Sequence, residues 1–224
     1  IQGPRSVEIV TPLIASADRE RIKAMKYYSC AQTSVAGIPL LLARTGYTGE
    51  DGFELFVENE RAVALWDALL EAGARTGLEP CGLGARDVLR LEAGMPLYGH
   101  ELEEEITPLQ AGLEWAVKFD KPEFEGKTAL AEQRAENDYP RIAGFVLEGR
   151  APPPRTGYRV YFEGRDVGEV CSGAPAPSLE NKSIGSALIE APAAKPGAVL
   201  AIEVRDNMWP ATVVKLPFYQ RTPS

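Results

Sequence analysis

The chain has 224 residues, of which 45% are hydrophobic and 25% charged, and its formal net charge is −8. This composition is typical of a globular protein with one large domain or two smaller ones. Because the net charge is negative and no Lys/Arg cluster stands out, a nucleic-acid partner is disfavoured. No apolar run reaches the roughly 18 residues that a membrane span needs, so no membrane association is expected.

The cysteines and the N-terminus bear on the compartment of the protein. Cys30, Cys81 and Cys171 are widely spaced and odd in number, so they give no disulfide framework. A reducing compartment, the cytoplasm of a bacterium, is therefore expected. The opening residues, "IQGPRSVEIV", lack an initiator Met and begin in mid-pattern, so we expect a further N-terminal portion. The alternative of a mitochondrial protein whose targeting peptide has been removed stays open.

The first part of the chain predicts a compact α+β unit. Its apolar spacing indicates a short amphipathic helix over 17–28 and two strands over 36–45 and 52–59, joined as a β-hairpin. A helix is expected over 59–73, because its apolar residues recur at helical spacing. The residues expected on the buried side of this helix are Val63, Trp66, Leu69 and Leu70.

The middle of the chain predicts two more helices. The first covers 81–94, is bracketed by glycines, and has Val88, Leu89 and Leu91 on its expected buried side. A strand is expected over 113–119 and a second helix over 126–137. These elements complete the first of two expected domains.

Past Tyr139 the sequence changes to short β-branched runs separated by Gly, Pro and Asn. Strands at such spacing indicate a small antiparallel barrel or sandwich. We therefore expect an α+β fold with a boundary near residue 139. The first domain is expected over 1–138, and a C-terminal antiparallel β-barrel or jelly-roll-like domain over 139–224.

The stretch "RTGYTGEDGFELF" at 44–56 joins a glycine-rich acidic turn to a strand that carries a glutamate. Gly49 and Gly52 are expected to allow positive φ where the chain reverses, and Asp51 before Gly52 is a hairpin signal. Strand alternation places Glu54 on the face opposite its two apolar neighbours. Two interpretations of Glu54 stay open: a solvated edge residue, or a buried carboxylate that accepts two adjacent N–H groups of a ligand.

Arg86, in "GLGARDVLRLEAG", lies in the first turn of a helix, where the helix dipole does not favour a cation. It is an exposed residue with Arg90 as its surface companion, one half of a salt bridge, or a group aimed at a ligand anion or carbonyl. His100 is the only histidine, so no His-rich metal site is expected. No nucleotide-binding loop and no GxSxG elbow is present, so a plain interaction domain also stays open.

Four stretches carry a family resemblance: "RTGYTGEDGFE", "GLGARDVLRLEAGMPLYGHEL", "ITPLQAGLEWAV" and "VVKLPFYQR". Together they closely resemble the T-protein family, the aminomethyltransferases of the glycine cleavage system, and the resemblance runs along essentially the whole chain. Sibling families share the fold, among them the folate-binding regions of sarcosine and dimethylglycine dehydrogenases. They resemble "GYTGE" only loosely.

The resemblance implies a three-domain ring around a central hole that holds tetrahydrofolate. It implies that a one-carbon unit passes from the aminomethyl-lipoyl arm of the H-protein to tetrahydrofolate, with release of ammonia, giving 5,10-methylenetetrahydrofolate. At the matching positions, Glu54 and Arg86 are implied to contact folate. Tyr47 is implied to line the same pocket, and Arg221 to complete it from the tail. Glu54 is thus expected to be largely buried and to face a concave pocket shared with Arg86.

The resemblance also implies a departure from the family. The catalytic aspartate of the family lies upstream of these residues, so no catalytic residue and no metal ligand is assigned here. Asp51 belongs to a turn and Asp87 to a helix start. The chain is then expected to be a piece of the enzyme with little activity of its own. The alternative is a non-catalytic folate-binding protein, or another folate-dependent one-carbon relative of the sarcosine or dimethylglycine dehydrogenase type.

Overall fold

The computed structural model describes residues 1–221, and residues 222–224 lie outside this description. The chain divides into two compact units, Ile1–Leu89 together with Arg221, and Arg90–Gln220. The tail residue Arg221 thus belongs to the first unit. The mixture of helix and sheet confirms the expected α+β class, whereas the boundary near residue 139 stays a prediction.

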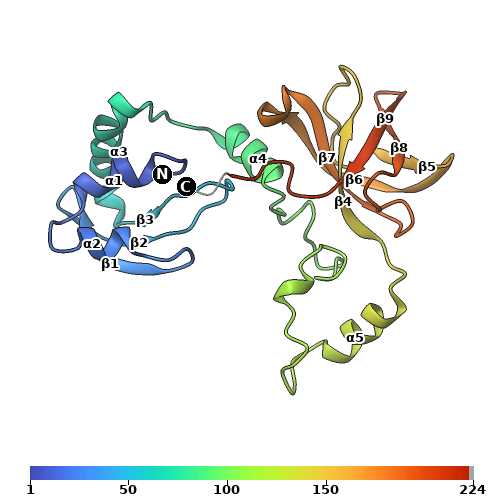
Figure 1. Cartoon of the computed structure of the whole chain (residues 1–224), viewed down its shortest axis with the longest axis horizontal. Coiled ribbons are helices and arrows are strands. Elements are labelled where there is room, and N and C mark those ends of the chain that lie inside the picture. Colours follow the sequence, from blue (N-terminus) through green and yellow to red (C-terminus); the bar gives the residue numbers. More distant parts are fainter. Residues whose placement is uncertain (222–224) are drawn as a thin grey trace. The chain divides into compact units, whose positions relative to one another are not determined.

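The first unit is built on a small antiparallel sheet in the order β1-β2-β3 (Figure 1). Its helices and strands are, in chain order, α1 (Ser6–Val10), the 3-10 helix η1 (Thr11–Leu13), α2 (Arg19–Lys23), β1 (Cys30–Val35), β2 (Ile38–Ala43), β3 (Glu54–Phe56), α3 (Asn59–Gly73) and the 3-10 helix η2 (Ala74–Thr76). The hairpin and the helix over 59–73 are confirmed. The helix expected over 17–28 is reduced to the five residues of α2.

Apolar side chains join one face of this sheet to the helices. Leu40 and Leu42 alternate along β2 toward that face, and Leu65 of α3 packs against the same cluster. The buried members of the cluster are Val10, Ile14, Ile22, Val35, Leu40, Leu42, Phe53 and Leu65. The core of the first unit therefore lies on one side of the sheet.

The buried side of α3 differs from the expected one. Leu65 is buried and Leu69 packs against the core, one turn further on, but Val63 is 72% exposed and Trp66 52% exposed. Apolar residues cover a wider arc of this helix than the sheet can contact, because successive residues are about 100° apart around the axis. The contact with the sheet selects the Leu65–Leu69 stripe.

The next segment also departs from the expected pattern. α4 (Leu83–Glu92) forms as expected, but its buried residues are Arg90, Leu91 and Glu92, while Leu89 is 37% exposed. Arg90 is thus not a surface companion of Arg86. The strand expected over 113–119 is wrong: a 3-10 helix, η3 (Glu114–Ala116), and turns occupy this stretch. Trp115 in this stretch is 71% exposed, and no strand within residues 1–221 pairs with the stretch.

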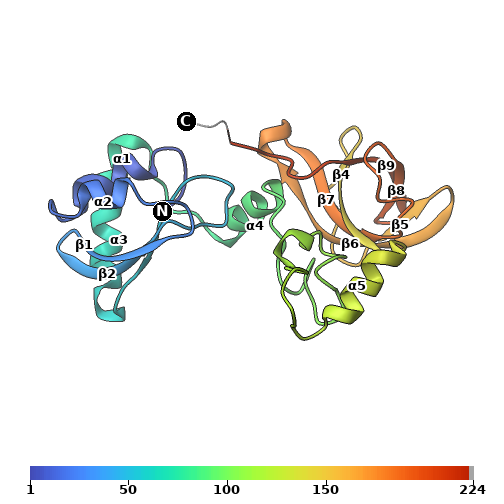
Figure 2. The ribbon, with the colours of Figure 1, turned by 60° about the horizontal axis from the view of Figure 1, so that its bottom comes forward.

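The second unit is dominated by a closed antiparallel barrel with the strand order β4-β7-β6-β5-β8-β9 (Figure 1). Figure 2 shows α5 (Lys127–Glu136) outside this barrel. The barrel elements are β4 (Arg141–Leu147), β5 (Arg159–Phe162), β6 (Arg165–Ala176), the 3-10 helix η4 (Pro177–Leu179), β7 (Lys182–Ile189), β8 (Val199–Val204) and β9 (Asn207–Val214). The expected C-terminal β-barrel is confirmed.

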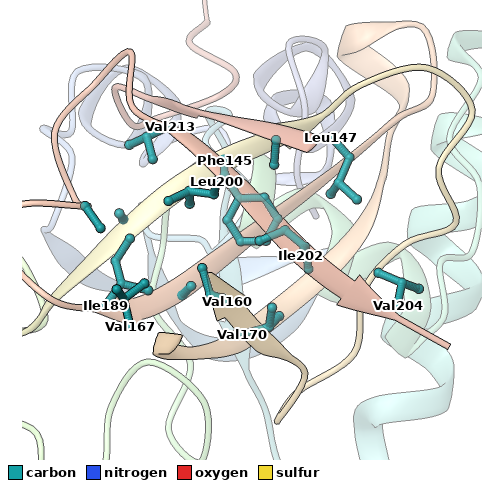
Figure 3. Close-up of a cluster of buried hydrophobic side chains, with 14 of the residues drawn as sticks. Phe145, Leu147, Val160, Val167, Val170, Ile189, Leu200, Ile202, Val204 and Val213 are labelled. Carbon is teal, nitrogen blue, oxygen red and sulfur yellow. The ribbon is translucent and has the colours of Figure 1, made fainter. Parts of the chain in front are cut away.

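Side chains fill the interior of the barrel, which is too narrow to leave a channel. Figure 3 shows Phe145 of β4 in the middle of this core, among Leu200 and Ile202 of β8. Inward residues alternate with outward ones along β8, as half-buried strands require. Closure of the β4–β9 pairing removes the free edges that an open sheet of this size would carry.

A buried ion pair fastens the end of α4 to the barrel within the second unit. The Arg90 and Glu101 side chains are 1% and 3% exposed, with Arg90 Nη1 2.9 Å from Glu101 Oε2. Arg90 Nη2 donates to Ser172 Oγ of β6 at 2.7 Å, and Ser186 Oγ of β7 donates to Glu101 Oε1. The backbone N–H of Leu97 donates to Glu101 Oε2 at 2.9 Å. Both charges are therefore paired and hydrogen-bonded, as burial demands.

The Arg90–Glu101 pair gives a stability prediction. Replacing Arg90 with Ala leaves the Glu101 carboxylate buried without its cation, which costs about 3–5 kcal/mol in comparable buried pairs. We expect the free energy of unfolding, measured by urea denaturation, to fall by an amount in this range. Arg134 is the matched control, because it pairs with Glu114 at 2.7 Å while both side chains are about half exposed. Arg134→Ala should cost less than about 1 kcal/mol, and equal losses for the two variants would contradict the prediction.

Candidate functional site

The candidate site begins with the register of the β2–β3 hairpin. Ala43 lies opposite Glu54, and Leu42 opposite Leu55. Leu55 packs toward the core, whereas Glu54 and Phe56 are on the other face, as strand alternation predicts. Glu54 is exposed, so the expectation that it is largely buried is wrong. The reason is that the core of the first unit covers only one face of its sheet.

The open face of the sheet is apolar beside Glu54. One row along from the Ala43–Glu54 pair, Leu41 lies opposite Phe56, and both are exposed, by 38% and 56%. They line an open groove of about 600 Å³ whose lining also includes the polar residues Gln32, Glu58 and Asn59. Glu54 lies on the same face of β3 as Phe56, so a carboxylate stands beside a groove of mixed polar and apolar lining, which suits a flat heterocyclic ligand with polar edges.

Glu54 has one neutral hydrogen-bond partner. The hydroxyl of Thr45, two residues beyond the end of β2, donates to Glu54 Oε2. A carboxylate has about four acceptor positions on its two oxygens, so this bond leaves most of them open to a ligand. Thr45 was not predicted from the sequence. Its place in the register, two residues after the partner of Glu54, could have indicated it.

The loop over 44–53 is closed by an ion pair at its base. Arg44 donates two hydrogen bonds to Asp51, from Nε to Oδ1 at 3.1 Å and from Nη2 to Oδ2 at 2.7 Å. The Arg44 hydrogen bonds are the main reason why the pKa of Asp51 lies below its usual value. Arg44 also donates from Nη1 to the carbonyl of Met25 at 2.7 Å. Asp51 is therefore a structural carboxylate, fixed in its ionised form.

A second clamp on the loop comes from Gln2. Its Nε2 donates to the carbonyl of Thr45 at 3.0 Å, and its Oε1 accepts from Thr48 Oγ1 at 3.2 Å. A Cβ added to Gly46 would lie 1.9 Å from Gln2 Oε1, and one added to Gly52 would lie 2.6 Å from Gln2 Cδ. These two glycines therefore make room for the Gln2 side chain.

The backbone angles of the loop refine the expectation for its glycines. Gly49 has φ +76°, as a chain reversal requires, so its predicted positive φ is confirmed. Gly52 is absent from the positive-φ positions of the described residues, so its predicted positive φ is wrong. Close approach of another part of the chain, not backbone conformation, requires glycine there. The sequence carried no signal of the distant partner Gln2.

The structure brings two of the expected site residues together. The guanidinium carbon of Arg86, in the first turn of α4, lies 4.7 Å from the centroid of the Tyr47 ring. This is a cation–π contact, which orients both side chains. Arg86 is exposed and Tyr47 is half-buried. The contact supports a shared site for this pair, while the convergence of Arg86 on Glu54 stays a prediction.

Arg221 and Tyr27 belong to the surroundings of Glu54 in the first unit. Burial is the main cause of a raised pKa of the Tyr27 phenol, the adjacent Tyr28 and Glu54 act in the same direction, and the positive charge of Arg221 acts against them. The Tyr27 and Tyr28 rings are in contact, with centroids 4.3 Å apart. Tyr27 was missed from the sequence, because its position before β1 gives no sign of what it faces.

Two family models match the chain: the GCVT N-terminal domain over residues 1–121, and the glycine cleavage T-protein C-terminal barrel domain over residues 141–220. The chain belongs to the glycine cleavage T-protein family. The second match covers the closed barrel, whose strands run from Arg141 to Val214. The first covers the sheet, the 44–53 loop and α4, and therefore the whole candidate site except Arg221.

Curated relatives in this family carry the name aminomethyltransferase. The protein of Streptomyces avermitilis is 51% identical over 99% of this chain, and that of Chlorobaculum tepidum 45% identical over 97%. The chain spans 59% and 58% of the lengths of these two relatives. The glycine cleavage system aminomethyltransferase T of Bartonella henselae has a similar crystal structure, with a TM-score of 0.79 at 30% identity. That match covers 88% of this chain and 54% of the other.

Other chemistry-bearing residues of this family member lie in the second unit. His100 Nδ1 is 2.9 Å from the carbonyl oxygen of Cys171, and Tyr98 is 69% exposed. Burial is the main cause that raises the pKa of the Cys171 thiol to about 12, so this thiol is unreactive. No group of three or more His, Cys, Asp or Glu side chains that could hold a metal occurs within residues 1–221. Among the helices of that same range, none is long and apolar enough to cross a membrane.

The position of Gln2 predicts that the cost of Gly46→Ala depends on whether the Gln2 side chain is present. Gly46→Ala should destabilise the first unit by about 1–3 kcal/mol, because the added methyl overpacks the loop. The three nearest atoms to that methyl all belong to the Gln2 side chain, so Gln2→Ala should remove most of this cost. Thermal unfolding of the single and double variants measures the coupling.

Gly52→Ala is the matched control for this cycle. Its added methyl would also lie 2.6 Å from the backbone carbonyl oxygen of Ile1, which truncating Gln2 does not move. The cost of Gly52→Ala should therefore persist in the Gln2→Ala background. Additive effects of Gly46→Ala and Gln2→Ala would show that Gln2 does not fill the space beside Gly46.

Proposed function

We propose that this chain serves the aminomethyltransferase reaction of the glycine cleavage system. In that reaction a one-carbon unit passes from the aminomethyl-lipoyl arm of the H-protein to tetrahydrofolate, ammonia is released, and 5,10-methylenetetrahydrofolate forms. Membership of the T-protein family supports this proposal, as do relatives named aminomethyltransferase at 45% to 51% identity. The lipoylated H-protein is the proposed macromolecular partner, and the bacterial cytoplasm the proposed compartment.

The observation that carries the proposal is the accessible Glu54 carboxylate on the open face of the sheet. It is ionisable and exposed, and its hydrogen-bond partner is the neutral hydroxyl of Thr45, so its charge is presented to a ligand. A carboxylate can accept two neighbouring N–H groups side by side, which is the edge that the pterin ring of a folate presents. The side chains of Leu41 and Phe56 in the groove beside Glu54 suit the flat faces of such a ring.

Arg86, Tyr47 and Arg221 complete the proposed site. Arg86 is held over the Tyr47 ring, which leaves the edge of its guanidinium group free to meet a carbonyl or carboxylate of folate. Arg221 contributes a positive charge on the same unit, where it acts on Tyr27 and Asp51. A folate carries both an N–H edge and carboxylates, so one acidic and two basic side chains match its charge pattern.

The proposed role of these residues is recognition and orientation. When bound, tetrahydrofolate supplies the amine groups that take up the one-carbon unit. Asp51 is committed to Arg44 and kept ionised, and Asp87 lies in α4, so neither is assigned a proton-transfer role. The catalytic acid is proposed to belong to a segment upstream of these residues, as the family resemblance implies.

The binding test concerns Glu54. Glu54→Gln exchanges an acceptor for a group that also presents donors, and loss of one charged hydrogen bond costs about 1.5–3 kcal/mol. The affinity of the chain for tetrahydrofolate, measured by anaerobic titration calorimetry, should fall about ten- to a hundredfold. Glu71→Gln is the matched control, since Glu71 is also exposed but lies on α3 and is not among the residues that line the groove. Unaltered affinity in Glu54→Gln would remove Glu54 from the site.

A second measurement separates an enzyme component from a non-catalytic folate-binding relative. H-protein loaded with the aminomethyl group should bind the chain in the presence of tetrahydrofolate, and little ammonia should be released by the 224-residue chain alone. Folate binding without any affinity for the H-protein would favour the non-catalytic alternative. Ammonia release at the rate of a whole aminomethyltransferase would show that an acid within the chain serves the reaction, against the role proposed for the upstream segment.

A further inference from the structure

We infer that Thr45 is a positioning residue for Glu54, an inference that rests on the proposed role of Glu54 in folate recognition. The Thr45 hydroxyl donates to Glu54 Oε2, across the hairpin and beside the Ala43–Glu54 pair. Thr45 reaches the carboxylate without being part of the sheet, because it lies two residues beyond the end of β2. It acts on a ligand only through Glu54.

An exposed glutamate needs such a partner to recognise a ligand with defined geometry. Its three side-chain torsions are otherwise free, and ordering them on binding costs affinity. Thr45 is β-branched, so its own χ1 torsion is restricted and its hydroxyl is a comparatively rigid donor. One hydrogen bond to Oε2 restrains the position of the carboxylate while Oε1 stays open. The carboxylate is thereby oriented before the ligand arrives.

Thr45 is itself held in place from the opposite side. Gln2 Nε2 donates to the Thr45 carbonyl at 3.0 Å and lies 3.4 Å from the carbonyl of Phe53, the residue before Glu54. The same amide group accepts from Thr48 through Oε1. Gln2 therefore connects the start of the 44–53 loop to its end. We expect this connection to hold the Thr45 hydroxyl close to Glu54.

The charge relations at the loop agree with this role. Asp51, at the base of the same loop, is held by the Arg44 cation, which neutralises it. The hydrogen-bond partner of Glu54 is instead a neutral hydroxyl, which orients the carboxylate without itself cancelling its charge. Thr45 thus performs for Glu54 the orienting function that Arg44 performs for Asp51.

The experiment compares Thr45→Val, Thr45→Ser and Thr76→Val in the 224-residue chain, with tetrahydrofolate as the probe in anaerobic titration calorimetry. Thr45→Val keeps the shape but loses the hydroxyl, so affinity should fall about three- to tenfold. Thr45→Ser keeps the hydroxyl and should bind within about twofold of the parent chain. Thr76 is the matched control, because its hydroxyl donates to the Gly73 carbonyl at 2.8 Å, and Thr76 is not among the residues that line the groove. Thr76→Val should alter the melting temperature and leave affinity unchanged.

A double variant separates positioning from a general structural effect. If Thr45 acts through Glu54, Thr45→Val should change affinity less than about twofold in the Glu54→Gln background. A full three- to tenfold loss in that background would overturn the inference, as would a normal affinity of Thr45→Val beside a weakened Glu54→Gln. Normal affinity of Glu54→Gln would instead overturn the proposed function, and the inference with it. Melting temperatures of all variants show whether each is folded at the temperature of titration.

Discussion

The pairing of β2 with β3 is the constraint on which the candidate site depends. In the observed register Leu42 and Leu55 face the core while Glu54 and Phe56 lie on the other face. A slip of one residue would exchange the two faces and place the Glu54 carboxylate in the core, where an unpaired charge is prohibitive. The apolar residues on either side of Glu54 thus hold this carboxylate on the open face, although they never contact a ligand. Fold and site are in this sense determined by the same alternation.

The two units differ in whether their charged side chains are exposed or buried. The first unit leaves its chemistry-bearing side chains exposed and restrains them with local partners, Thr45 for Glu54 and Tyr47 for Arg86. The second unit buries the Arg90–Glu101 pair and satisfies it with hydroxyls of the barrel. A fully satisfied buried pair confers a single arrangement on the elements it joins, while exposed and oriented groups remain available for binding. The first arrangement suits a site, and the second suits a scaffold.

Much of the fold could be predicted from the sequence because its signals are local. The β-branched runs past Tyr139 indicate the barrel, and the spacing within 59–73 indicates α3. The errors arose where tertiary contacts select among local possibilities. Only one stripe of α3 reaches the sheet, which leaves Trp66 outside, and the apolar 113–119 stretch finds no strand to pair with. The alternative that placed Arg90 at the surface beside Arg86 is wrong, and nothing nearby in the sequence indicates Glu101 and Ser172 as its buried partners.

The candidate site shows the same limit at the level of single residues. The family motif identified Glu54, Tyr47 and Arg86, and the contact between Tyr47 and Arg86 supports grouping them. The motif did not indicate Gln2, whose side chain determines why Gly46 and Gly52 are glycines. That reason is steric and comes from more than forty residues away. A pattern of glycines can therefore predict a turn correctly while giving the wrong physical cause for one of them.

Two carboxylates of one hairpin illustrate how the surroundings assign roles to chemically similar groups. Asp51 meets a guanidinium group in a two-pronged pair, which lowers its pKa and uses its acceptor positions to close the loop. Glu54, three residues later, accepts a hydrogen bond from a neutral hydroxyl at one of its oxygens. A cation both orients a carboxylate and cancels its field, whereas a hydroxyl orients it and leaves the field in place. The hairpin thus keeps Asp51 in a structural ion pair and presents Glu54 to a ligand. The difference lies in the partner that follows β2: Arg44 for Asp51 and Thr45 for Glu54.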